Sequence, residues 1–215
     1  MRRLLAIVAV SVIAMVAAPA GSAENAPWFA RAVGNATQVI SVVGEGGSNA
    51  KMDVWQRTSA GWQSIGVGIP AHVGSAGMAP QSKDGYPATP MGIFTLDYVF
   101  GTAPSPGGGL SYVQVGPDDW WDGDPSSPTY NTHQHCNKQQ CHFDTSDSEN
   151  LDIPQYVHSV VMGVNTKART PGNGSGFFMH ATDGGPTAGC VSLDDGKLVQ
   201  IIRWLRPGAL IAIAQ

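Results

Sequence analysis

The chain alternates short apolar runs with turns rich in glycine and proline, a pattern that predicts a mostly-β fold. Strands are expected where β-branched and aromatic residues gather between such turns. Two of these runs flank Ser59-Ala60-Gly61 and indicate a hairpin. The expected strands cover residues 37–43, 50–57, 62–69, 91–100, 112–115, 156–165, 176–182 and 209–214.

One segment has helical rather than strand periodicity. Apolar residues recur at helical spacing between Leu198 and Leu205, Asp194 or Asp195 can cap the start, and Pro207-Gly208 follows the end. Many short strands with one C-terminal helix predict a β-sandwich or barrel-like domain. A long insertion over 120–150, rich in Asp, Ser, Pro, Asn and His, is expected to lack regular structure, as functional or disordered loops do.

The N-terminus has the pattern of a secretory signal peptide at residues 1–23. Arg2 and Arg3 precede an apolar run over 4–18, and small residues follow up to Ala23. A membrane anchor is the alternative, although the run is shorter than the ~20 apolar residues of a spanning helix. We therefore expect an exported protein of the cell envelope, with a lead-in segment at 24–36 and one domain at 37–215.

Charge and cysteine content indicate which partners and which disulfide to expect. The net charge is −4 and no basic block occurs, so nucleic acid is not an expected partner. Of the three cysteines, Cys136 and Cys141 lie five residues apart and are natural disulfide partners in an exported protein, which leaves Cys190 as a free thiol. The neighbouring histidines keep zinc binding open as an alternative; they are His133, His135 and His142.

Two further groups of polar residues receive structural interpretations. The aspartates at 118–119 and 122–124 lack the spacing of a calcium-binding loop and are interpreted as loop caps. His72 and His158 belong to no motif and are interpreted as structural. No metal site is therefore predicted.

The segment from Phe177 to Leu193 carries the candidate chemistry. An apolar strand ends at His180, a Gly184-Gly185-Pro186 turn follows, and Gly189 directly precedes Cys190. A cysteine nucleophile reacts as the thiolate, and a nearby imidazole can take its proton. From these residues alone, an inert buried thiol remains an open alternative.

These residues resemble the active-site signature of the L,D-transpeptidase catalytic domain, the YkuD family, which runs in outline H-G-T, a loop, then S/T-H-G-C-h-R/N. The matching segments are His180-Ala181-Thr182 and Thr187-Ala188-Gly189-Cys190-Val191, and Ala88–Phe94 resembles the family's T-P-x-G-x-F segment. Three positions depart from the signature. Ala181 replaces a Gly, Ala188 stands where a His is common, and Ser192 stands where Arg or Asn is common.

The resemblance implies a cysteine-dependent L,D-transpeptidase that acts on peptidoglycan stem peptides as donor and acceptor. It implies Cys190 as the nucleophile and His180 as the general base and acid, with no cofactor. It further implies 3→3 crosslinks formed through a thioester and inhibition by carbapenem-type β-lactams. We also expect a monomer. The residues expected to bind the oxyanion, bind substrate or orient the base are Gly189, Ala188, Thr187 and Ala181. An L,D-carboxypeptidase, an unrelated cysteine hydrolase and a catalytically silent wall-binding scaffold remain alternatives.

Overall fold

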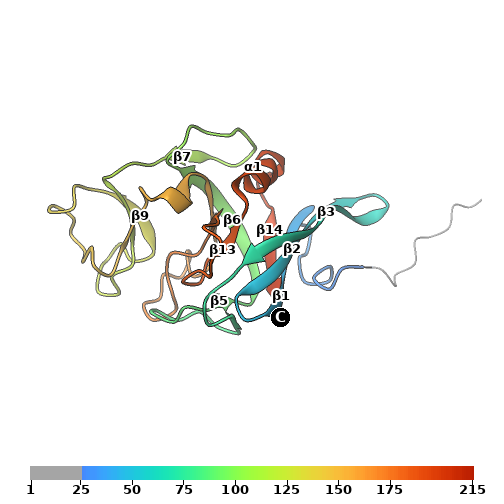
Figure 1. The fold of residues 1–215 in the computed structure, drawn as a ribbon, viewed down its shortest axis with the longest axis horizontal. Helices are drawn as coiled ribbons and strands as arrows, with labels where there is room; N and C mark the ends of the chain where they lie inside the picture. The colour runs from blue at the N-terminus through green and yellow to red at the C-terminus, as the bar shows by residue number, and fades with distance from the viewer. Residues whose placement is uncertain (1–25) are drawn as a thin grey trace, which may run out of the picture.

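The computed structural model describes residues 26–215, so the predicted signal peptide at 1–23 lies outside them. Nine strands form the main sheet in the order β11-β12-β13-β3-β2-β1-β14-β6-β7. Because β11 also pairs with β6, the sheet closes on itself as a barrel (Figure 1). In chain order the strands are β1 (Gln38–Gly46), β2 (Asn49–Thr58), β3 (Gly61–His72), β6 (Gly92–Gly101), β7 (Tyr112–Gln114), β11 (Ser159–Met162), β12 (Phe178–Ala181), β13 (Val191–Leu193) and β14 (Leu210–Ala214).

The mostly-β prediction and the hairpin prediction are confirmed, but the insertion is more regular than expected. It contains a three-stranded sheet of β8 (Asp119–Asp122), β9 (Thr132–His135) and β10 (Glu149–Asn150). Strands of two to four residues are too short for alternation to reveal them, and β10 pairs with β8 across a long stretch of chain. The remaining short elements are β4 (Met78–Ala79), β5 (Thr89–Pro90) and the 3₁₀ turn η2 (Pro154–Tyr156).

Strand alternation divides the apolar residues between the inside and the outside of the barrel. On β1, Ile40 and Val42 belong to the main core, whereas Val39 packs with Phe29 of the lead-in segment on the other face. Because successive strand residues point to opposite faces, one short strand contributes to both clusters. Each such buried aliphatic side chain contributes about 1.5–3 kcal/mol of transfer free energy.

The predicted helix is present as α1 (Asp195–Trp204). Asp194 is its cap, and its Oδ1 accepts a hydrogen bond from the backbone N–H of Lys197 at 3.0 Å. The apolar face of α1 packs on the main barrel core through Leu198 and Ile202. Within residues 26–215, no helix has the length and apolar content needed to cross a membrane.

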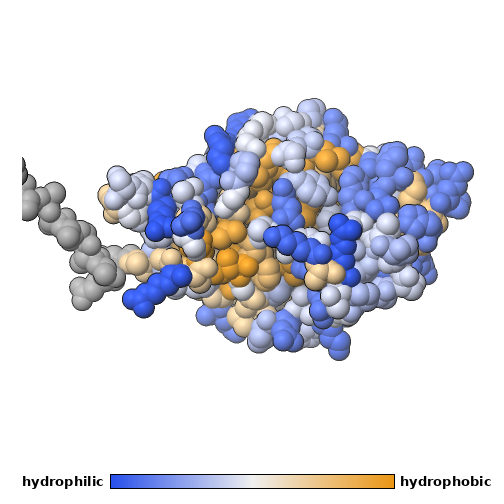
Figure 2. All heavy atoms as spheres, turned by 180° about the vertical axis from the view of Figure 1, so that it is seen from behind, coloured by the Kyte–Doolittle hydropathy of each residue, from blue (hydrophilic) through white to orange (hydrophobic). Residues whose placement is uncertain are grey.

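The insertion is held together mainly by polar groups, and the end of the molecule that carries β9 has a largely hydrophilic surface (Figure 2). The Asp122 carboxylate accepts hydrogen bonds from Ser127, Thr129 and the Asp124 N–H, as expected of a loop cap. Cys136 and Cys141 form the expected disulfide, so neither is available as a zinc ligand.

The histidines near the disulfide have protein partners of their own. Asp119 Oδ1 lies 2.8 Å from His133 Nε2 and 3.0 Å from His135 Nδ1, and His142 Nε2 lies 2.9 Å from Thr129 Oγ1. Over residues 26–215, no three His, Cys, Asp or Glu side chains are arranged to hold a metal ion. His158, interpreted as structural, pairs with Asp195 at 2.9 Å.

Replacing Cys136 and Cys141 with serine should lower the free energy of unfolding by about 2 kcal/mol, because the disulfide closes a loop of only a few residues. Urea unfolding of the variant and the parent chain measures the difference. The unfolded, unreduced parent should contain one titratable thiol, that of Cys190. Three titratable thiols would contradict the disulfide.

Candidate active site

The site is built on two adjacent parallel strands. In the pairing of β12 with β13, His180 lies opposite Ser192, and Met179 lies opposite Val191. Cys190 directly precedes β13, two positions before Ser192, so it shares a sheet face with His180 on a diagonal. The structure therefore brings together the two side chains that the sequence singled out.

These two side chains line a cavity of about 750 Å³, within the size range of small-molecule sites. Of the other candidate residues, Thr187, Ala188 and Gly189 line the same cavity, and Ala181 does not. The His133–His142 segment does not contribute to this cavity.

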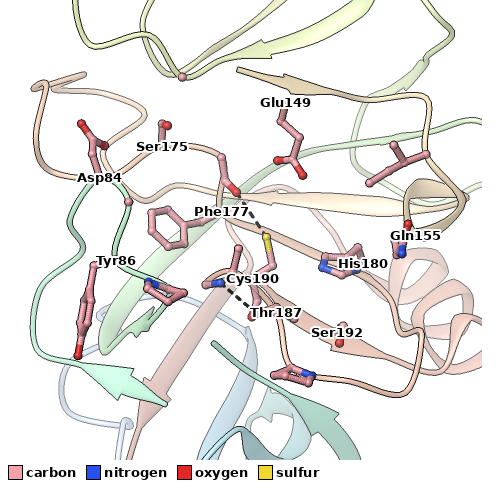
Figure 3. Close-up of a pocket in the computed structure, with 18 of the residues that line it drawn as sticks. Asp84, Tyr86, Glu149, Gln155, Ser175, Phe177, His180, Thr187, Cys190 and Ser192 are labelled. Atoms are coloured by element: carbon pink, nitrogen blue, oxygen red, sulfur yellow. Dashed lines mark hydrogen bonds between the residues drawn. The ribbon is translucent and has the colours of Figure 1, made fainter. Parts of the chain in front are cut away.

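Cys190 is 7% exposed, and its thiol makes hydrogen bonds to the chain just before and within β12. The sulfur accepts the N–H of Phe178 at 3.3 Å. It donates to the Gly176 carbonyl at 3.4 Å, the bond drawn from the sulfur in Figure 3. Among residues 26–215, no hydrogen bond joins the sulfur to His180. The thiol must therefore turn away from Gly176 before it can transfer its proton to the imidazole.

The imidazole of His180 is fixed in one tautomer. Its Nδ1 lies 2.8 Å from the carbonyl of Ala181, which can only accept, so Nδ1 carries the proton. In the neutral ring, Nε2 is then the acceptor. Ala181 thus contributes by orienting His180 rather than by lining the cavity.

Burial keeps both groups neutral in the resting site. It lowers the pKa of His180, an effect that the Ala181 carbonyl and Asp183 only partly oppose. Burial also raises the pKa of Cys190, and the nearby Glu149 carboxylate adds to this increase. A thiol and a neutral imidazole therefore describe the resting state better than a thiolate–imidazolium pair.

Two threonines hold the backbone around the nucleophile. Thr187 Oγ1 accepts the Gly189 N–H at 3.0 Å and donates to the Cys190 carbonyl at 2.7 Å. Thr89, fully buried in β5, accepts the Gly74 N–H at 2.9 Å and donates to the Gly189 carbonyl at 2.8 Å. The Thr89-Pro90 segment therefore anchors the loop that carries Cys190.

Only glycine fits at position 189. Its φ is +142°, and a Cβ there would lie 2.9 Å from the ring of Phe177 and 3.2 Å from the Ala88 carbonyl. Because the Gly189 N–H is bonded to Thr187, it is not free to bind an oxyanion in this state. Within residues 26–215, the N–H groups of Cys190 and Ala188 have no hydrogen-bond partner.

Sequence reasoning missed several residues of the cavity. Glu149 enters from β10, and Tyr156 donates its hydroxyl to Glu149 Oε1 while its ring packs edge-on against His180 at 5.4 Å between centroids. No motif marks either residue, because Glu149 reaches the site through the pairing of β10 with β8 and Tyr156 through the 3₁₀ turn η2. Ser192 also lines the cavity, and its buried hydroxyl has no partner within the described chain.

A comparison of the sequence with protein families identifies the family of the chain. The family model of the L,D-transpeptidase catalytic domain, YkuD, matches residues 45–213, which is most of the chain. The chain belongs to this family. In this L,D-transpeptidase domain, His180 and Cys190, the two residues that the motif singles out, lie where β12 and β13 meet. Searches of curated proteins and of solved structures found no match to the chain.

Replacing Thr89 with valine should lower the free energy of unfolding by about 1–3 kcal/mol or more, because the Gly74 N–H and the Gly189 carbonyl lose a buried partner. Thr89→Ser is the matched control, since it keeps the hydroxyl and should be closer to the parent chain. Urea unfolding compares the three proteins. A loss in Thr89→Ser with none in Thr89→Val would show that the methyl group matters rather than the hydroxyl.

The raised pKa of Cys190 predicts a slow thiol. Iodoacetamide should alkylate Cys190 in the folded chain at pH 7–8 more slowly than it alkylates a free cysteine of pKa about 8.5, and the rate should rise in more alkaline solution. The pH profile of alkylation, followed by mass spectrometry, measures this. An inflection below pH 7 would instead reveal a preformed thiolate–imidazolium pair.

Proposed function

We propose that the chain is an active L,D-transpeptidase that forms 3→3 crosslinks between peptidoglycan stem peptides through a thioester on Cys190. One observation supports this proposal: a free thiol and a neutral histidine line the same cavity, and the histidine Nε2 is left as the acceptor. A silent scaffold has no need for a histidine held in the tautomer that accepts a thiol proton.

Acylation starts when the thiol turns from Gly176 toward His180 Nε2. His180 takes the proton while Cys190 Sγ attacks the carbonyl between the third stem residue and the terminal D-alanine. The free N–H groups of Cys190 and Ala188 are the available donors to the oxyanion. His180 then returns the proton to the departing D-alanine amine, and the thioester remains on Cys190.

The thioester has two fates in the same cavity. The side-chain amine of a second stem peptide attacks the carbonyl, the C–S bond breaks, and a 3→3 crosslink forms. Attack by water instead makes the chain an L,D-carboxypeptidase.

We place the protein outside the cytoplasm, in the cell envelope, as a monomer that carbapenem-type β-lactams acylate at Cys190. The pattern of residues 1–23 supports export. The Cys136–Cys141 disulfide supports it independently, because such bonds persist in oxidising compartments.

The test is incubation with defined tetrapeptide muropeptides and analysis of products by mass spectrometry. We expect released D-alanine and 3→3 crosslinked dimers, and no product from Cys190→Ala. His180→Ala should form thioester about 10²–10⁴-fold more slowly, the usual contribution of a positioned proton-transfer group.

Each alternative gives a different result in this experiment. D-alanine release with tripeptide as the only other product would identify a carboxypeptidase. Absence of any release, together with absence of a carbapenem adduct on Cys190, would support a silent scaffold. Equal turnover in Cys190→Ala and the parent chain would contradict the mechanism.

A further inference from the structure

A carboxylate from the insertion reaches the nucleophile. Glu149 lies on β10, where it pairs with Trp121 of β8, and its side chain enters the cavity above Cys190 (Figure 3). Glu149 and Cys190 are distant in sequence and belong to different sheets. The insertion therefore adds an acidic group to a site that the barrel strands β12 and β13 otherwise form.

One oxygen of this carboxylate is fixed and the other is free. Tyr156 donates its hydroxyl to Oε1. Oε2 has no hydrogen-bond partner within residues 26–215, and it lies 3.5 Å from the position that a Cβ on Gly176 would occupy. Because the Gly176 carbonyl in turn accepts the Cys190 thiol, Oε2 lies within reach of a group that approaches the sulfur.

The charges around the cavity favour a cation. The carboxylates that line it belong to Asp84, Asp147, Glu149 and Asp183, whereas Lys83 is the single lining residue with a permanent positive charge. Asp84 is already bonded to Tyr130 and to the Gly172 N–H. Glu149 is thus the carboxylate that lies near the sulfur and retains a free oxygen.

We propose that Glu149 binds the ammonium group of the acceptor and removes one of its protons before the amine attacks the Cys190 thioester. This inference rests on the proposed function and specifies one of its steps. Tyr156 is the positioning residue, because its hydroxyl occupies Oε1 and leaves Oε2 to face the acceptor.

The step balances in protons and bonds. The ammonium transfers one proton to Glu149, and the resulting amine forms a C–N bond to the thioester carbonyl. When the tetrahedral intermediate collapses, the C–S bond breaks, and the second nitrogen proton passes through His180 to the Cys190 sulfur. Glu149 then releases its proton to solvent, so the net reaction converts an ammonium and a thioester into an amide, a thiol and a proton.

Such a carboxylate decides the fate of the thioester. An ammonium ion has no lone pair with which to attack, so an acceptor amine needs a base at the moment of reaction. Burial raises the pKa of Glu149, an effect that the Tyr156 hydroxyl opposes, so the carboxylate is a stronger base than an exposed one. Water carries no positive charge, so the ionised Glu149 attracts the acceptor and not its competitor. Glu149 is therefore a residue that selects crosslinking over hydrolysis.

The experiment measures the ratio of crosslinked to hydrolysed product for Glu149→Gln, with a lysine-containing stem peptide as acceptor. Glutamine retains the size and can still accept from Tyr156, so the fold should persist. We expect the ratio to fall by about 10²-fold or more. Asp152→Asn is the matched control, because it removes the same charge from an exposed residue near Glu149 in the chain that does not line the cavity, and its ratio should match the parent chain.

A second acceptor identifies the cause. Hydroxylamine is already neutral at pH 7 and needs no base, so Glu149→Gln should use it as well as the parent chain does. Equal losses with both acceptors, or a ratio unchanged with the stem peptide, would overturn the role of Glu149. D-alanine release reports acylation separately. If the parent chain released none, the proposed function would fail first and the Glu149 step with it.

Discussion

The parallel pairing of β12 with β13 is the constraint on which the site depends. Its register places His180 opposite Ser192 and sets Cys190 on the adjacent diagonal. A slip of one residue would turn one of the two side chains to the other sheet face, where Met179 and Val191 fill the barrel core. The apolar residues that alternate with His180 and Cys190 therefore fix the register. Packing inside the barrel thereby determines how His180 and Cys190 are placed on its outer face.

The same burial that fixes the geometry also sets the protonation state. The aromatic cluster around Phe178 and Tyr156 covers the outer face of β12 and excludes water from both reactive groups. Burial disfavours charge, so the pKa of His180 falls and that of Cys190 rises. A neutral thiol is also protected from indiscriminate oxidation. In the proposed mechanism, the Cys190 thiol must therefore be activated in the presence of substrate, by turning toward His180.

The sequence predicted those parts of the molecule that depend on local pattern. The α1 cap at Asp194 follows from helical spacing, and the Cys136–Cys141 disulfide follows from proximity in the chain. Both His180 and Cys190 were found through a motif, because neighbouring strands separated by a short loop carry them. Glu149 could not be found in this way. It reaches the cavity through a two-residue strand that pairs with Trp121, and neither alternation nor a motif marks a contact formed only by the folded insertion.

Ser192 stands where the family signature has Arg or Asn, and its lack of charge affects how strongly Glu149 makes the cavity negative. Its small side chain lies opposite His180 and lines the cavity without adding charge. An arginine there would place a permanent cation beside the imidazole, further lower the pKa of His180, and offset the Glu149 carboxylate. With serine, the cavity keeps its negative character. The departure from the signature and the carboxylate contributed by the insertion therefore act in the same direction, because both keep the cavity negative, as the proposed positively charged acceptor requires.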